Sequence, residues 1–275
     1  RNIWQYQKNC TKYDLNLLYV PKEGVCEFNN PEFTTKIAFN NHKRLHSKNN
    51  EVISPNESLI AVIGDSVAMG WGVNDNETFS YHLERLIKKK VINLAVSSYG
   101  TIREIKRLKS SKYYDQIDTI IIQYNINDIY ENKNLDFNKT YSREDYENIF
   151  LSNKYKFNKT LFLLRIYKKS LRLLFSDIKN LLVKSKRIEK YNLDNDILIL
   201  KSIIKQQLSE EKKRILVILI QEPHILIENI EKIKDDKFEF LNIKLEKNSF
   251  FIVDEHPNNK GHQKIAAALF KYLSK

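Results

Sequence analysis

Glycine and proline are scarce in this sequence, with only 6 and 5 residues among 275. Collagen-like chains, Gly/Ser linkers and proline-rich segments need far more of these residues, so the composition excludes those classes. The sequence also lacks any run of about 18 uncharged apolar residues, which excludes a membrane-spanning helix within it. With 42% hydrophobic and 11% aromatic residues, the chain can bury one sizeable core and is not intrinsically disordered.

Cysteine is equally rare. Cys10 and Cys26 are the only two, and no second pair or nearby histidine completes a tetrahedral zinc site. Spacing does not fix connectivity, so two interpretations stay open, a disulfide or two separate buried thiols. We predict the disulfide, which would close a loop of about 17 residues and stabilise the fold by ~3 kcal/mol. A disulfide would indicate an oxidising compartment.

Basic residues are in excess, since 46 Lys and Arg against 34 Asp and Glu give a net charge of +12. A charge of this size can attract nucleic acid, an anionic membrane or an acidic polymer. The basic residues are scattered along the chain rather than gathered in one stripe, and lysine is used wherever a solvated polar residue is tolerated. We therefore expect no nucleic-acid partner.

Short apolar runs alternate with amphipathic segments from residue 59 onward, which is typical of parallel strands connected by helices. The runs that predict strands are 59–63, 91–95, 119–123, 215–220 and 250–253. The segments that predict helices are 77–88, 102–109, 196–211 and 260–273. The alternation predicts an α/β fold, a three-layer α/β/α sandwich with a mainly parallel five-stranded sheet. Its ligand site should lie at the carboxyl ends of the strands.

Two segments depart from this alternation. Residues 1–57 contain aromatics and turn formers without a long period, so we expect an irregular leader packed on the main domain, residues 58–275. Residues 130–195 form an insertion, in which 161–187 interleaves apolar with basic residues as amphipathic helices do. That stretch either packs its apolar face on the domain or serves as a lid or a membrane-surface contact.

Residues with complementary chemistry follow the first and last apolar runs. Ser66 comes directly after the first run and after Gly64, a residue that permits a tight turn. Asp254 and His256 follow the last run. Because the carboxyl ends of parallel strands meet at one edge of a sheet, we expect these three side chains to lie close together. Acyl transfer needs a hydroxyl that attacks, a base that removes its proton and a carboxylate that orients the base.

Two further strand ends carry polar groups. Asn125 and Asn127 follow the third apolar run, and Ser98 follows the second. Amide side chains and loop N–H groups at these points could face a developing oxyanion. Each residue taken singly fits a helix cap or a turn, but the convergence of four strand ends on one edge favours a site.

These motifs, in this order, resemble the SGNH, or GDSL, hydrolase family over about residues 58–275. The resemblance is carried by three sequence blocks, namely Gly64-Asp65-Ser66, Asn125-x-Asn127-Asp128 and Asp254-x-His256-Pro257. It implies Ser66 as nucleophile, His256 as base and Asp254 as the partner that orients the imidazole. It also implies an oxyanion hole formed by the N–H groups of Ser66 and Ser98 and by the side chain of Asn127.

Three positions depart from the family pattern. Ser98 stands where the family usually has a glycine, so its N–H is retained while its Cβ would narrow the pocket. Asn125 replaces the glycine that usually opens the third block, which predicts an unusual backbone conformation there. One residue rather than the more usual two separates Asp254 from His256, a spacing that also occurs in bacterial relatives.

The other histidines do not suggest a metal site. His262 is expected to pack at the start of the last helix, while the remaining ones lack a constellation of partners, namely His42, His46, His82 and His224. We therefore expect neither a metal nor a cofactor.

The leader, including Cys10, Cys26 and Glu32-Phe33, resembles a region that precedes the hydrolase domain in some bacterial extracytoplasmic proteins. Because the sequence begins with Arg1 rather than Met, we expect an upstream signal peptide or anchor, and a periplasmic or envelope-anchored protein. The expected function is a serine esterase that removes a short acyl group, most simply acetyl, from an envelope glycan. The alternatives are an O-acyltransferase on such glycans, a lipase or lysophospholipase, and a non-catalytic glycan-binding module.

Overall fold

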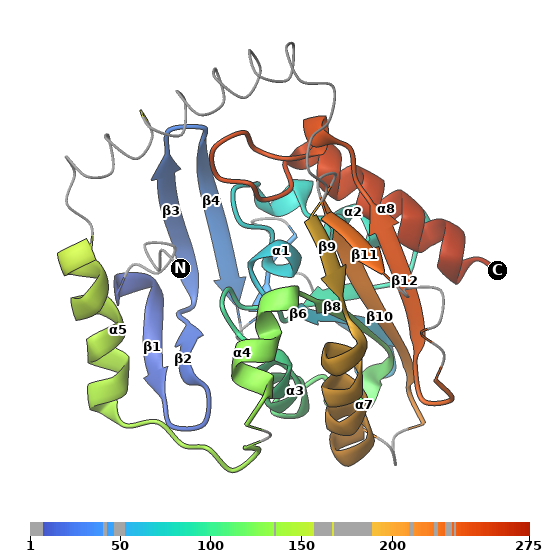
Figure 1. The fold of residues 1–275 in the computed structure, drawn as a ribbon, viewed down its shortest axis with the longest axis horizontal. Helices are drawn as coiled ribbons and strands as arrows, with labels where there is room; N and C mark the ends of the chain where they lie inside the picture. The colour runs from blue at the N-terminus through green and yellow to red at the C-terminus, as the bar shows by residue number, and fades with distance from the viewer. Residues whose placement is uncertain are drawn as a thin grey trace.

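The computed structural model describes residues 8–40, 43–46, 53–134, 136–156, 167, 189–208, 212–222, 225–228, 233 and 235–275. Within them, an eight-stranded sheet forms the centre of the fold (Figure 1). Its strands, in spatial order, are β12 (Glu239–Lys244), β10 (Arg214–Gln221), β8 (Ile117–Tyr124), β6 (Leu59–Gly64), β7 (Val91–Asn93), β5 (Lys43–Arg44), β4 (Phe33–Asn40) and β3 (Gly24–Asn30).

The first five strands in this order pair in parallel. β6 lies in the middle of the sheet between β8 and β7 and is buried at every position, which explains why its sequence is a continuous apolar run. The strands β6, β7, β8 and β10 coincide with four of the five predicted runs. The mainly parallel sheet is therefore confirmed, although it has eight strands instead of five.

The fifth parallel strand is not the predicted run 250–253. Phe250 makes an isolated bridge to Pro257, and the run continues as a turn in which Ile252 is 68% exposed. The actual strand is β12, which pairs only with β10 at the edge of the sheet. An edge strand is less deeply buried, and β12 accordingly mixes apolar residues with Glu239, Asn242 and Lys244. The prediction was wrong because an apolar loop imitates a strand more closely than a polar edge strand does.

The leader is not irregular, so that prediction is wrong as well. It contains a hairpin of β1 (Thr11–Asp14) and β2 (Leu18–Pro21), preceded by a short 3-10 helix η2 (Lys8–Cys10). It then contributes β3, β4 and β5 to the main sheet as antiparallel strands. The leader thus extends the edge of the sheet beyond β7, and its strands pack with the core instead of covering it loosely.

The predicted disulfide between Cys10 and Cys26 is confirmed. It joins the start of the β1–β2 hairpin to the middle of β3, so it links two parts of the leader to each other. Both cysteines are buried within the apolar cluster that lies under α2 and α8. A crosslink over a loop of this length stabilises by roughly 3 kcal/mol in the chain-entropy model.

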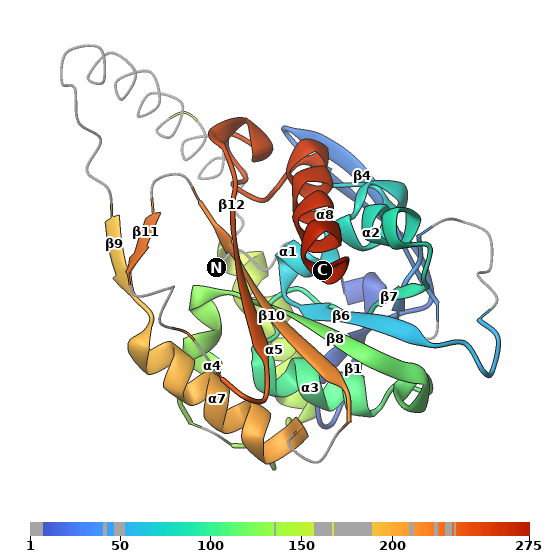
Figure 2. The same cartoon turned by 90° about the vertical axis from the view of Figure 1, so that its right-hand side faces the viewer.

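Helices cover both faces of the sheet (Figure 2). On one face lie α2 (Phe79–Ile87) and α8 (Asn259–Leu273), and on the other α3 (Thr101–Lys109) and α7 (Asp194–Leu208). Alternate residues of β6 serve the two layers, because Ile60 and Val62 pack under α2 and α8 while Ala61 and Ile63 pack under α3 and α7. All four helices coincide with predicted segments, which confirms the three-layer architecture.

The insertion is described in part. It contains the end of α4 (Ile129–Asn132), α5 (Arg143–Lys156) and β9 (Glu189–Asn192), which pairs with β11 (Ile225–Glu228) in a separate small sheet. The predicted amphipathic stretch 161–187 lies outside the described residues, apart from Tyr167. Among the helices in the described ranges, none is long and apolar enough to cross a membrane. The remaining short elements are η3 (Asp75–Glu77), η4 (Tyr114–Gln116), η5 (Ile126–Asp128) and η7 (Lys247–Ser249).

Buried His262 leads to a prediction about acid stability. Its Nδ1 accepts a hydrogen bond from the Phe79 N–H at 3.1 Å, and burial lowers its pKa to about 3. A histidine in an unfolded chain has a pKa of about 6.5, so the unfolded state takes up a proton first. The free energy of unfolding should therefore fall as the pH drops from about 6.5 towards the folded-state pKa.

The variant His262→Asn keeps an acceptor near the position of Nδ1 but does not titrate in this range. Its free energy of unfolding, measured with denaturant at several pH values, should depend less steeply on pH than that of the wild type. Equal slopes in the two proteins would contradict the prediction.

Candidate active site

Ser66 lies where the sequence predicts it, directly after β6 and at the first position of the short helix α1 (Ser66–Met69). Gly64 turns the chain there with φ +150°, and a Cβ on it would lie 2.7 Å from that of Ala68. Asp65 accepts a hydrogen bond from the Val67 N–H at 2.9 Å. The Ala68 N–H donates to Gln123 Oε1 at 3.1 Å. Within the described part of the chain, the Ser66 N–H has no acceptor.

Ser66, His256 and Asp254 form a chain of hydrogen bonds. The Ser66 Oγ lies 2.8 Å from His256 Nε2, and His256 Nδ1 lies 2.6 Å from Asp254 Oδ1. Ser66 is 7% exposed, and the side chains of His256 and Asp254 are 19% and 7% exposed. A serine hydroxyl thus contacts an imidazole whose far nitrogen is held by a nearly buried carboxylate, the arrangement of a base-activated nucleophile.

A tight turn explains how the side chains of Asp254 and His256 meet with a single residue between them. Glu255 adopts the left-handed conformation with φ +70°. The Phe251 N–H donates to the His256 carbonyl at 2.9 Å, which closes the turn. The segment therefore lies in a loop between η7 and α8. The sequence had instead indicated the end of a strand.

Asp254 has additional partners that the motif does not include. Its Oδ2 accepts hydrogen bonds from Asn30 Nδ2 at 3.0 Å and from Trp71 Nε1 at 3.3 Å. The Glu32 carboxylate accepts backbone hydrogen bonds from the same loop, including one from the Asp254 N–H at 2.7 Å. None of these three residues carries a sequence signal for the site, apart from the resemblance of the leader around Glu32 to a known region.

Two glycines after Ser66 stand where other parts of the chain approach the backbone closely. A Cβ on Gly70 would lie 2.7 Å from the Arg44 side chain, and one on Gly72 would lie 2.6 Å from the Phe251 ring. Arg44 is fully buried, pairs with Asp75 at 3.0 Å and donates to the Gly70 carbonyl at 2.7 Å. The turn after α1 is thus clamped by the leader strand β5 and by the loop before α8.

Ser98 has the backbone conformation that explains why a glycine is usual at its position. Its φ is +59°, in the left-handed region that glycine favours. Arg103 Nη2 donates to the Ser98 carbonyl at 2.6 Å, and the Tyr19 hydroxyl of the leader donates to the Ser97 carbonyl at 2.9 Å. Among the described residues, no acceptor faces the Ser98 N–H. Arg103 and Tyr19 thus fix the carbonyl groups of this loop and leave the Ser98 N–H unused.

This geometry predicts that Ser98→Gly preserves activity, because the backbone N–H and not the side chain is the proposed donor. Glycine also removes the cost of a left-handed residue, about 1 kcal/mol, while the added freedom of the unfolded chain offsets most of that gain. We expect kcat on an acetyl ester within about threefold of wild type. A loss beyond about tenfold, with an unchanged melting temperature, would show that the Ser98 hydroxyl itself takes part.

Asn125 does not have the unusual backbone that the sequence predicts, so that expectation is wrong. Its φ of −119° and ψ of 139° are extended, and any residue adopts them. Its side chain donates to Asp65 Oδ2 at 3.0 Å and accepts from the Asn127 N–H at 3.4 Å. Asn125 thereby links the first and third sequence blocks, which a glycine could not do.

Asn127 differs from its neighbours because its side chain is unused. Both Oδ1 and Nδ2 are buried and have no hydrogen-bond partner in the described part of the chain. A buried amide without partners costs about 1–3 kcal/mol, so its retention needs an explanation. A substrate oxygen would supply the missing acceptor for Nδ2, which agrees with the expected oxyanion role.

A buried carboxyl group, that of Glu104, interacts electrostatically with Asp65 and Asp128 of the first and third sequence blocks. Glu104 on α3 is 2% exposed, and neither of its oxygens has a hydrogen-bond partner in the described ranges. Burial, followed by the charges of Asp128 and Asp65, raises the pKa of Glu104 well above its ordinary value.

The other histidines are accounted for structurally where they are described. His262 packs at the start of α8 as expected. His46 does have partners, contrary to the sequence interpretation, since its Nε2 lies 3.2 Å from Ser80 Oγ and its Nδ1 lies 3.5 Å from a Glu84 oxygen. Ser80 is fully buried and therefore inaccessible to a substrate. No cluster of three metal-ligating side chains occurs in the described ranges.

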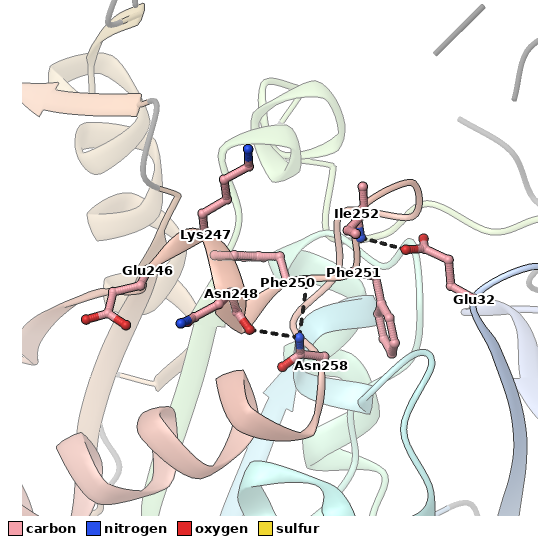
Figure 3. A pocket seen from close by; sticks show the side chains of 8 residues that line it. All are labelled: Glu32, Glu246, Lys247, Asn248, Phe250, Phe251, Ile252 and Asn258. Carbon is pink, nitrogen blue, oxygen red and sulfur yellow. Dashed lines mark hydrogen bonds between the residues drawn. The ribbon is translucent and has the colours of Figure 1, made fainter. Parts of the chain in front are cut away.

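A surface hollow borders the loop that carries Asp254 (Figure 3). Its lining includes Glu32 from the leader together with Lys247, Asn248, Phe250, Ile252 and Asn258. Ser66, Asp254 and His256 do not line it. The hollow therefore lies next to the candidate site and is separate from its three hydrogen-bonded side chains.

No family model and no curated protein matches the chain. Solved structures do match. A carbohydrate esterase family 2 enzyme with a carbohydrate-binding domain from Corynascus thermopiles is 12% identical, with a TM-score of 0.44, over 82% of this chain and 68% of that one. An acetyl xylan esterase from Butyrivibrio proteoclasticus is 15% identical, with a TM-score of 0.41, over 81% and 64%. A GDSL-like lipase from Bacteroides thetaiotaomicron is 11% identical, with a TM-score of 0.40, over 81% and 90%.

Proposed function

We propose that this protein is a serine esterase of the SGNH type that removes an acetyl group from an envelope or extracellular glycan. The observation that carries the proposal is the hydrogen-bond chain from Ser66 Oγ through His256 to Asp254, at 2.8 and 2.6 Å. These distances match those between a nucleophile, its general base and the group that orients the base. Ser66 and His256 are 190 positions apart in the sequence, so chance proximity within one turn does not account for their contact.

The proposed reaction has two halves. The Ser66 Oγ attacks the acetyl carbonyl while His256 Nε2 takes the hydroxyl proton, and the carbonyl oxygen becomes an oxyanion. The oxyanion collapses, the bond to the sugar oxygen breaks, and that oxygen takes the proton from His256. Water then attacks acetyl-Ser66 with His256 again as base, which releases acetate and restores Ser66. Asp254 stabilises the imidazolium in both halves.

Three donors are proposed to stabilise the oxyanion, namely the N–H groups of Ser66 and Ser98 and the amide of Asn127. All three lack an acceptor within the described residues. Preorganised donors of this kind stabilise the charge that develops in the transition state. The two departures at Ser98 and Asn125 are accommodated without loss of a donor, which favours a working enzyme over a glycan-binding module on a decayed fold.

The proposed location is outside the cytoplasm, in the periplasm or at the envelope. The disulfide between Cys10 and Cys26 supports an oxidising compartment. An acylated carbohydrate in the envelope is the proposed substrate. A membrane-surface contact through 161–187, which would suit a lipase, falls outside the described residues.

The decisive experiment is a screen of acetylated glycans and simple acyl esters with the wild type and Ser66→Ala, in which free acetate is measured. We expect acetate release by the wild type alone and labelling of Ser66 by a serine-directed fluorophosphonate. Transfer of the acetyl group to an added saccharide would identify an O-acyltransferase, and a preference for long acyl chains would identify a lipase. A folded wild type that neither reacts with the fluorophosphonate nor releases an acid would overturn the proposal.

A further inference from the structure

The tip of the β3–β4 hairpin in the leader lies against the loop that carries Asp254, as the blue strands and the red loop show in Figure 1. The Glu32 carboxylate accepts three backbone hydrogen bonds from this loop, one on Oε1 from Ile252 (Figure 3) and two on Oε2 from Val253 and Asp254. Each is 2.7 Å long. Hydrogen bonds to an ionised acceptor are about twice as strong as neutral ones, so one side chain fixes three consecutive peptide groups.

Asn30, at the end of β3, contacts the carboxylate of Asp254 itself. Its Nδ2 donates to Oδ2 at 3.0 Å, on the opposite oxygen from the one that faces His256. Trp71 donates to the same Oδ2 at 3.3 Å. With both oxygens engaged, the plane of the carboxylate is set, and with it the direction in which Asp254 holds the imidazole.

Aromatic packing presses the hairpin and the loop together. The Phe33 ring lies 4.9 Å from the Phe251 ring and 5.6 Å from the Trp71 ring, between centroids. A Cβ on Gly72 would lie 2.6 Å from Phe251 and 3.0 Å from Phe33. The hairpin, the turn at Gly72 and the loop are therefore in close contact. The hydrogen bonds of Glu32 and Asn30 are therefore held in a close-packed setting.

We propose that Glu32 and Asn30 are positioning residues for Asp254, so that the leader hairpin contributes to the geometry of the candidate active site. Glu32 fixes the backbone at Asp254, and Asn30 fixes its carboxylate. Neither side chain is hydrogen-bonded to Ser66 or His256 in the described structure, so both act through Asp254. This inference rests on the proposed esterase function, because it assigns the two residues a part in the same site.

A purely structural role makes a different prediction. A glutamate that only satisfies loop N–H groups would stabilise the fold when present and leave the turnover of folded protein unchanged when replaced. A positioning role instead lowers kcat at constant KM, because a displacement of the reacting groups by about 1 Å can cost about a hundredfold in rate. The ratio of kcat to KM effects in folded protein therefore separates the two.

The test uses two near-isosteric variants in the full chain, Glu32→Gln and Asn30→Asp. The first replaces one carboxylate oxygen by an N–H₂ group that faces backbone donors, and the second sets a carboxylate against Asp254. Matched controls make the same changes on the same hairpin. Glu27→Gln removes an exposed carboxylate paired with Lys36, and Asn29→Asp alters the neighbour of Asn30.

We expect Glu32→Gln and Asn30→Asp to lower kcat on an acetyl ester by about ten- to a hundredfold with KM within about twofold. Both controls should stay within about twofold of wild type. Melting temperatures identify the temperature range in which each variant is folded, and the rates are compared there. Wild-type kcat in either test variant, or an equal loss in its control, would overturn the proposal. If Glu32→Gln does not fold, Asn30→Asp alone decides.

A second measurement keeps this proposal separate from the proposed function. The proton NMR signal of the His256 Nδ1–H, which lies far downfield when it is bonded to a carboxylate at short distance, needs no turnover. We expect the signal in the wild type and the controls and its loss or upfield shift in the two test variants. If the enzyme is active and the signal is unchanged in the test variants, the positioning role is rejected and the esterase function stands. If the signal is altered but the protein has no esterase activity, the esterase function is rejected and the positioning of Asp254 stands.

Discussion

Ser66→Ala and His256→Ala should each lower kcat for acetyl-ester hydrolysis by several orders of magnitude. Ser66→Ala removes the atom that is proposed to form the acyl bond. His256→Ala removes the proposed base, which lies 2.8 Å from that atom, so the serine hydroxyl would keep its proton at neutral pH. Because the three residues act as a unit, we expect the double variant to lose little more than either single variant.

Acetate release and fluorophosphonate labelling, measured on protein of confirmed melting temperature, check this result. Ser54→Ala and His82→Ala are suitable controls, because Ser54 is exposed and half-buried His82 contacts Asn259 and not the site. Both controls should stay near wild-type activity. Retention of most activity by pure Ser66→Ala would end the nucleophile assignment.

The parallel sheet could be predicted because strands that are buried on both faces contain continuous apolar runs. β6 and β8 are flanked by strands on both sides and covered by helices above and below, so almost every position is buried and each strand contains a continuous apolar run. Two candidate site residues, Ser66 and Asn127, follow such strands, which is why the sequence could predict their place at one edge of the sheet. His256 was located by its motif, although the strand assigned before it does not exist.

The contribution of the leader could not be predicted from the same signals. Its strands pair antiparallel at the edge of the sheet and alternate between exposed and buried positions, as in β3, so no continuous apolar run marks them. The contacts of Asn30 and Glu32 join residues more than 200 positions apart, and each depends on one side chain at a hairpin tip. A tertiary contact of this kind leaves no periodicity, so only the structure reveals it.

Asn127→Ala should lower kcat about a hundredfold or more while leaving the protein at least as stable. Removing one oxyanion donor costs about 2.7–4 kcal/mol of transition-state stabilisation in comparable enzymes. In the folded protein, however, the Asn127 amide is buried and without a partner in the described residues. Its removal takes away an unsatisfied buried group, so the free energy of unfolding should stay constant or rise by about 1 kcal/mol.

Opposite signs for activity and stability distinguish a residue kept for the transition state from one kept for the fold. Asn127→Asp extends the comparison, since the carboxylate has the same shape but would repel an oxyanion, and its loss of kcat should exceed that of Asn127→Ala. Asn125→Ala provides the contrast, because it breaks the bond to Asp65 at 3.0 Å and should lower stability together with activity. Urea unfolding and kcat measured on the same preparations give both quantities. A clear loss of stability in Asn127→Ala, proportionate to its loss of activity, would assign Asn127 to the fold and remove it from the oxyanion hole.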